Sequence, residues 1–92
     1  MTPEGRVKVK VKAWLVANKV WHYCPVSIGM GTHGIPDFVC CAPGGRFMGI
    51  EVKAPGKRKN TSALQDMQLE AIAENGGLAI VVDDVSQLEG IL

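Results

Sequence analysis

The sequence predicts a single α/β domain whose elements follow in the order α-β-β-β-α-β-α. A length of 92 residues allows one compact domain. Two apolar stretches joined by Pro43-Gly44-Gly45 are typical of a hairpin. A helical segment then separates residues 46–53 from residues 78–82, and a crossing helix places the two strands that it joins parallel. We therefore expect antiparallel and parallel pairing in one sheet.

The first segment, residues 2–18, fits two periodicities. Valines alternate with lysines from position 7 to position 12, which is typical of a half-buried strand. The order Thr2 then Pro3 instead resembles a helix N-cap followed by the first helical residue. A helical stripe extends along the same segment through Val7, Val11, Trp14, Leu15 and Asn18. We predict a helix.

Aromatic and β-branched residues at positions 21–27 predict a strand, with an edge or bulge at Pro25. Glycines at positions 29, 31 and 34 mark a loop before the two strands of the hairpin, at 36–42 and 46–53. After a loop at 54–60, Thr61 or Ser62 caps a helix that runs to about Glu74.

The C-terminal part contains one more strand and one more helix. Asn75-Gly76-Gly77 ends the preceding helix. The apolar run at 78–82 is typical of a strand buried on both faces. Residues 85–92 predict a short closing helix, with Asp83 and Asp84 at its N-terminus.

Composition and charge exclude several classes of protein. Hydrophobic residues make up 47% of the chain and charged residues 21%, which is typical of a globular protein and not of a disordered one. A net charge of +1 excludes a protein that coats nucleic acid by bulk charge. No apolar run approaches the roughly 20 residues that span a bilayer, and residues 1–12 lack the apolar core of a signal peptide. We expect no membrane partner.

The cysteines indicate a reducing compartment. Cys24, Cys40 and Cys41 fit no zinc-binding spacing with the histidines, so reduced thiols in the cytoplasm are expected and a structural zinc is a remote alternative. So short a chain builds a marginal core, for which oligomerisation is a usual remedy.

Three charged side chains converge at one end of the hairpin. Asp37 opens the first strand, while Glu51 and Lys53, two residues apart at the end of the second, leave the same face. Two carboxylates there suit Mg²⁺ or Mn²⁺. A lysine beside the metal can orient or help to deprotonate a water, or neutralise charge on a phosphate. The residues therefore suit metal-assisted phosphodiester hydrolysis.

The alternative is a polar strand start and a solvated face with weak ion pairs. Two features favour the functional interpretation. Glu51 follows an apolar run at 47–50, where an unused charge is costly. The basic loop of Lys57, Arg58 and Lys59 leads to a helix N-terminus, which is a natural site for a phosphate backbone.

These residues carry a resemblance to a known family. Gly34-Ile35-Pro36-Asp37, then Gly49-Ile50-Glu51-Val52-Lys53, then Ser62-x-x-Gln65 resemble the PD-(D/E)xK nuclease superfamily, and more closely its VRR-NUC (virus-type replication-repair nuclease) family. The resemblance covers most of the chain. It implies a restriction-endonuclease-like fold, with a mixed central sheet flanked by helices.

The resemblance also implies roles for individual residues. Asp37 and Glu51 would bind Mg²⁺ or Mn²⁺, with the Val52 carbonyl as a further ligand. Lys53 matches the motif lysine, and Gln65 matches the helix glutamine near the site. Glu4 matches an acidic residue that the family often has on its first helix, provided that residues 2–18 are helical.

Other polar residues have two interpretations each. His33 precedes the motif and either contacts the scissile phosphate of DNA or a metal-bound water, or has no functional role in its loop, and the absence of a role is favoured. Ser62 either contacts phosphate or only caps its helix, and capping is favoured. Lys8, Lys10 and Lys12 either face DNA or form a solvated stripe, and the stripe is favoured. Trp21 is expected in the core or at a dimer interface.

We therefore expect a metal-dependent, structure-selective DNA endonuclease without an organic cofactor. The stand-alone viral members that it resembles imply a homodimer that acts on branched DNA with the activity of a Holliday-junction resolvase. They also imply a phage or prophage gene and a location in the cytoplasm of the bacterial host. A flap or nicking nuclease, and a non-catalytic DNA-binding module on the same fold, are the alternatives.

Overall fold

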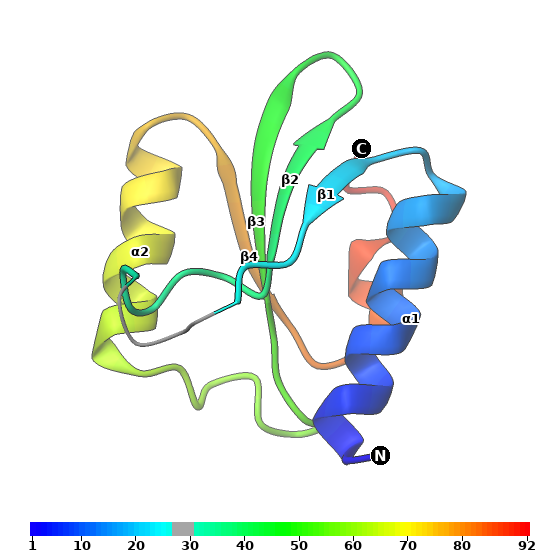
Figure 1. Cartoon of the computed structure of the whole chain (residues 1–92), viewed down its shortest axis with the longest axis vertical. Coiled ribbons are helices and arrows are strands. Elements are labelled where there is room, and N and C mark those ends of the chain that lie inside the picture. The colour runs from blue at the N-terminus through cyan, green and yellow to red at the C-terminus, as the bar shows by residue number, and fades with distance from the viewer. Residues whose placement is uncertain (27–30) are drawn as a thin grey trace.

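A computed structural model describes residues 1–26 and 31–92. Four strands form one sheet in the order β1-β2-β3-β4, with one long helix on each side (Figure 1). The elements are α1 (Pro3–Ala17), β1 (Trp21–Tyr23), β2 (Phe38–Ala42), β3 (Arg46–Val52), α2 (Ala63–Glu74), β4 (Leu78–Val82) and the 3₁₀ turn η1 (Val85–Leu88). The α/β class and the mixed sheet flanked by helices are confirmed.

The N-terminal segment is a helix, as predicted. The Thr2 hydroxyl accepts a hydrogen bond from the Gly5 N–H at 3.0 Å, and Pro3 begins the helix. Val7, Val11 and Leu15 lie at helical spacing and are buried against the sheet. Trp14 is partly buried and packs against the same core, while Val9 is exposed, so burial follows helical spacing and not the alternation of valine and lysine.

The strand pairing also agrees with the prediction. β2 pairs antiparallel with β3 in a register that places Phe38 opposite Ile50. β3 pairs parallel with β4, with Ile50 opposite Ile80, because α2 carries the chain back across the sheet between them. β3 is therefore a central strand with neighbours on both sides.

Three expected elements are different in the structure. β1 ends at Tyr23, because Pro25 cannot donate to a strand ladder; Ser27 lies outside the described residues. β4 is an edge strand, so of its residues only Val82 is fully buried and the expected burial on both faces is wrong. The closing helix shortens to η1, because Glu89 is extended and Gly90 has a φ of 75°.

Alternate residues of β3 lie on opposite faces of the sheet, one covered by α1 and the other by α2. Met48, Ile50 and Val52 are fully buried and pack with the apolar face of α1. On the other face, a Cβ atom at Gly49 would lie 2.8 Å from the Ile72 side chain of α2. Glycine at this position lets α2 approach the sheet closely, and the next residue on that face is Glu51.

None of the helices in the described part of the chain is long and apolar enough to cross a membrane. The three cysteines are free thiols.

Candidate active site

Asp37 lies at the end of the hairpin where β2 begins. The register that pairs Phe38 with Ile50 continues by one step to place Asp37 opposite Glu51. The Val52 N–H donates to Asp37 Oδ2 at 2.8 Å. This bond fixes one carboxylate oxygen of Asp37 and leaves Oδ1 directed elsewhere.

Glu51 carries a carboxylate in the interior, with only 4% of the residue exposed. Gln65 Nε2 donates to its Oε2 at 2.8 Å, and Lys53 Nζ lies 3.4 Å from the same oxygen. In the described part of the chain, no buried side-chain nitrogen or oxygen lacks a hydrogen-bond partner. The buried charge is therefore held by specific contacts.

Gln65 links this carboxylate to the start of α2. Its Oε1 accepts from the Ser62 N–H and from Lys53 Nζ, both at 3.0 Å. The Ser62 hydroxyl in turn accepts from the Gln65 N–H at 3.1 Å, which completes a capping box. One side chain therefore caps the helix and positions both Glu51 and Lys53.

Electrostatics within the site favour binding of a cation. Burial, and then the negative charge of Asp37, raise the pKa of Glu51 to about 7, while Lys53 opposes the shift. The two carboxylates repel each other when both are ionised, and a divalent cation between them would relieve that repulsion.

The donor set fits a hard divalent cation that keeps part of its hydration shell. Within residues 1–26 and 31–92, no three His, Cys, Asp or Glu side chains form a group that could hold a metal ion on their own. Two carboxylates supplemented by a backbone carbonyl and water are nevertheless a ligand set that suits Mg²⁺ or Mn²⁺.

Glu4 reaches the edge of this site through Lys8, for which a place in a solvated stripe was expected. Lys8 Nζ lies 3.3 Å from Asp37 Oδ1 and 3.5 Å from Glu4 Oε2. Partial burial lowers the pKa of Lys8, but the carboxylates of Asp37 and Glu4 outweigh this effect and hold the pKa above its usual value. The i, i+4 spacing of Glu4 and Lys8 was the available signal.

The loop before Asp37 is fitted to the first turn of α2. Gly34 has a φ of +83°, and a Cβ atom there would lie 2.4 Å from the Leu64 carbonyl oxygen. Pro36 is buried, and its ring lies so close to Gly49 that a Cβ atom added there would be 3.0 Å from Pro36 Cγ. The glycine that precedes the Pro-Asp motif therefore sets the distance between Asp37 and the helix that carries Gln65.

No protein-family model matches the sequence, and no curated protein is significantly similar to it. A solved structure described as a VRR_NUC domain is similar to the chain with a TM-score of 0.75 and 27% sequence identity. The similarity covers 99% of this chain and 95% of that one. The chain has the fold of a VRR-NUC domain. The resemblance seen in its motifs is thereby confirmed, and it places the chain alongside a family of nuclease domains.

Two hydrogen bonds join the basic loop to β4 and to the residue that follows it, while the lysines of the loop are exposed. The Gly56 N–H donates to Asp83 Oδ2 at 2.9 Å, and Arg58 Nε donates to the Val81 carbonyl at 2.6 Å. The side chains of Lys57 and Lys59 are exposed. Asp83 therefore supports the loop instead of binding metal, and Asp84 caps η1 by accepting from the Ser86 N–H.

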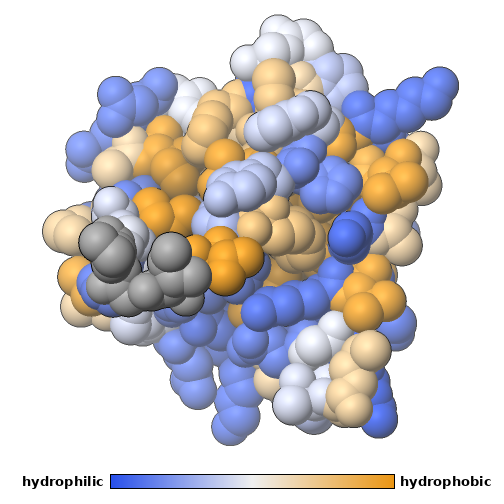
Figure 2. Space-filling model, in the orientation of Figure 1, coloured by the Kyte–Doolittle hydropathy of each residue, from blue (hydrophilic) through white to orange (hydrophobic). Residues whose placement is uncertain are grey.

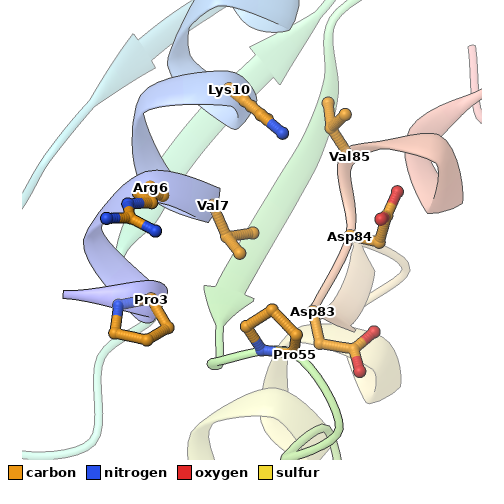
Figure 3. Close-up of a pocket in the computed structure, with 8 residues that line it drawn as sticks. All are labelled: Pro3, Arg6, Val7, Lys10, Pro55, Asp83, Asp84 and Val85. Carbon is orange, nitrogen blue, oxygen red and sulfur yellow. The ribbon is translucent and has the colours of Figure 1, made fainter.

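A small groove separates this loop from α1 (Figure 3). It encloses about 180 Å³ and has Lys10 on the α1 wall and Val85 on the opposite wall. Asp83 and Asp84 line it as well, but both carboxylates already serve the contacts described above.

Among the described residues, two predicted DNA contacts, His33 and Ser62, make no hydrogen bond to Asp37 or Glu51. His33 is exposed and lines a cavity of about 420 Å³ together with Tyr23 and Val39. Ser62 uses its hydroxyl as the helix cap. The structure thus brings Asp37, Glu51, Lys53 and Gln65 together, with Glu4 at the rim, and leaves His33 outside this group.

Proposed function

We propose that the chain is a metal-dependent DNA endonuclease that hydrolyses phosphodiester bonds in branched DNA. The observation that carries the proposal is the buried Glu51 carboxylate, which lies beside Asp37 and is held by Gln65 and Lys53. A structural role does not require such an arrangement, because removing both charges would lower the desolvation cost of the fold.

Asp37 and Glu51 are the proposed ligands of Mg²⁺ or Mn²⁺, with the Val52 carbonyl and Glu4 as additional ligands. When bound, the divalent cation supplies Lewis-acid stabilisation of the negative charge that develops on the phosphate. The VRR_NUC similarity supports this assignment at the level of the family.

Lys53 is the proposed catalytic lysine. Its ammonium is held between Gln65 Oε1 and Glu51 Oε2, with 14% of the side chain exposed. From this position it can orient the attacking water or offset charge on the scissile phosphate. Gln65 is the proposed positioning residue, because its two hydrogen bonds fix the lysine relative to the carboxylate.

The DNA backbone is proposed to follow the basic loop. Lys57 and Lys59 are exposed and supply charge without base recognition, and Arg58 adds charge near the base of the loop. Ser62 at the N-terminus of α2 and His33 are proposed as further DNA contacts. Hydrophilic side chains gather over the lower part of the view in Figure 2, on the side where this loop lies in Figure 1.

We further propose that the chain acts as a homodimer that uses the outer face of β1 and β2. Trp21, Cys41 and Phe47 form one row across three strands, and Trp21 is 64% exposed while Phe47 is 44% exposed. Tyr23, in the next row, is 55% exposed. Apolar and weakly polar side chains gather over this part of the molecule in Figure 2.

The size and composition of this surface support a second copy as its occupant. An aromatic side chain has about 200 Å² of surface, so the exposed fractions of these three side chains correspond to on the order of 300 Å² in total. A stable interface buries about 800 Å² per partner, with an aromatic centre that is poor in charge. The aromatic rows would supply that centre, and a two-fold dimer would present two sites to a symmetric DNA junction.

The test is cleavage of labelled DNA by the purified protein in Mg²⁺ or Mn²⁺. The substrates are a four-way junction, a 5′ flap, a single strand and a plain duplex. We expect paired, symmetric cuts in the junction. We expect no cutting by Glu51→Ala or Lys53→Ala, although both should still bind the junction, and no change for Glu70→Ala on the exposed part of α2.

The other outcomes distinguish the alternatives. Cutting of the flap or the single strand would retain a nuclease and discard the junction resolvase. Binding without cutting by the folded, metal-loaded protein would identify a non-catalytic DNA-binding module. Loss of junction binding in both Glu51→Ala and Lys53→Ala, with the fold intact, would contradict the separation of binding from chemistry.

A further inference from the structure

We propose that Lys8 is an exchangeable internal cation of the carboxylate site. Its ammonium neutralises Asp37 and Glu4 in the metal-free chain and leaves when a divalent cation enters. The inference rests on the proposed metal-binding function of Asp37, and it adds a residue that competes with the metal for the same oxygen.

The contacts of Asp37 identify the oxygen for which they compete. Oδ2 accepts the Val52 N–H at 2.8 Å and belongs to the backbone of β3. Oδ1 is the other oxygen of the carboxylate, and Lys8 Nζ lies 3.3 Å from it. A divalent cation bound to Asp37 through Oδ1 would therefore meet the ammonium of Lys8 at its ligand atom.

The two lysines of the site differ in how firmly they are held. Lys53 pairs with Glu51, contacts Gln65 and has 14% of its side chain exposed. Lys8 makes two ion pairs, at 3.3 and 3.5 Å, and has 40% of its side chain exposed. Its flexible four-carbon stem and its access to water allow it to leave, whereas Lys53 is enclosed.

Electrostatic repulsion makes the exchange necessary. A monovalent ammonium and a divalent cation that share carboxylate oxygens repel each other at close range, in a site that is only partly solvated. The metal also binds Glu4 and Asp37 more strongly than the ammonium does, since it carries twice the charge. Metal affinity should therefore be limited by the work of displacing Lys8.

The test is calorimetric titration of the metal-free protein with Mn²⁺ at pH 8, together with melting curves in a chelator. We expect Lys8→Met to bind Mn²⁺ about tenfold more tightly than the natural chain, because the competing cation is absent. In the chelator, the same variant should melt at a lower temperature, because the carboxylates lose their counter-charge. Lys8→Gln provides a second uncharged variant if Lys8→Met does not fold.

Two controls separate charge from position. Lys8→Arg keeps the charge and should bind Mn²⁺ as the natural chain does. Lys12→Met removes a charge from an exposed position of the same helix that, within the described part of the chain, makes no ion pair to Asp37, and it should change neither the affinity nor the melting temperature. Equal affinity in the natural chain and in both uncharged variants would overturn the role of Lys8. Absence of Mn²⁺ binding in the natural chain would instead overturn the proposed metal site.

Discussion

At the scale of single residues, the buried carboxyl group of Glu51 makes the behaviour of the site depend on pH. Its pKa of about 7 lies above the ordinary glutamate value of 4.5, so the folded chain holds this proton over a pH range in which the unfolded chain has lost it. The stability that comes from the raised pKa is present below about pH 4.5 and is lost as the pH rises through 7. Metal binding has the opposite requirement, since it needs the ionised carboxylate.

We predict that Glu51→Gln raises the melting temperature of the metal-free protein at pH 8 by roughly 5 °C, because it removes a buried charge beside Asp37. At pH 5 the natural chain carries the proton, so the difference should nearly vanish. Differential scanning calorimetry in a chelator at both pH values measures this. An equal difference at the two pH values would contradict the raised pKa.

We also predict that Mn²⁺ affinity falls about tenfold for each pH unit below 7, because a proton then competes for Glu51. Calorimetric titration between pH 5.5 and pH 8 measures the slope. A constant affinity across this range would show that Glu51 is not a ligand.

Gln65 acts both in the helix cap and in the site. We predict that Gln65→Ala lowers stability by about 1 kcal/mol through loss of the capping box, and lowers cleavage further through loss of the bonds to Glu51 and Lys53. Gln68→Ala on the same helix is the matched control. Chemical unfolding and single-turnover cleavage separate the two effects, and equal cleavage by the two variants would exclude a positioning role.

At the scale of elements, the loop before β2 and the first turn of α2 set the width of the site. We predict that Gly34→Ala destabilises the chain by more than about 2 kcal/mol, because its Cβ atom would overlap the Leu64 carbonyl. Gly44→Ala is the matched control: Gly44 has a φ of +89° but no atom within 4 Å of an added Cβ, so about 1 kcal/mol is expected. Urea unfolding measures both values, and equal costs would mean that strain alone matters at Gly34.

The sequence predicted those elements whose local signals agree with their packing. The cap at Thr2 and the spacing of Val7, Val11 and Leu15 identified α1 despite the alternating lysines. The prediction that β4 is buried on both faces was wrong, because an apolar run does not reveal the order of the strands in the sheet. The observed order leaves β4 at the edge. The closing helix was predicted too long, because the extended backbone of Glu89 and the positive φ of Gly90 end it after Leu88.

The candidate site, too, was predicted where local signals define it and missed where it depends on packing. Asp37, Glu51 and Lys53 come from one hairpin, so strand geometry was enough to group them, whereas Gln65 was assigned to the site only through the resemblance to the VRR-NUC family. Lys8 was missed because its contact with Asp37 depends on how α1 packs across the end of the sheet. A single sequence does not specify that angle.

At the scale of the whole molecule, the proposed homodimer depends on the exposed aromatic rows on β1–β3. We predict that Trp21→Glu shifts the protein from dimer to monomer in sedimentation experiments and converts paired junction cuts into single nicks. Val16→Glu replaces an apolar side chain of α1 that is 61% exposed, and it should leave the dimer intact. A natural chain that sediments as a monomer at cleavage concentrations would contradict the dimer.

The carboxylate site joins all three layers of the molecule. Glu4 and Lys8 belong to α1, Asp37 directly precedes β2, Glu51 lies in β3, and the Glu51 carboxylate is bonded to α2 through Gln65. A ligand held there therefore acts as a cross-link between layers that otherwise share a small core. At a concentration a thousand times its dissociation constant, such a ligand would add about 4 kcal/mol to the unfolding free energy. For a domain of this size that is a large fraction of the total. Metal supply would then determine how long the chain resists proteolysis, independently of any DNA.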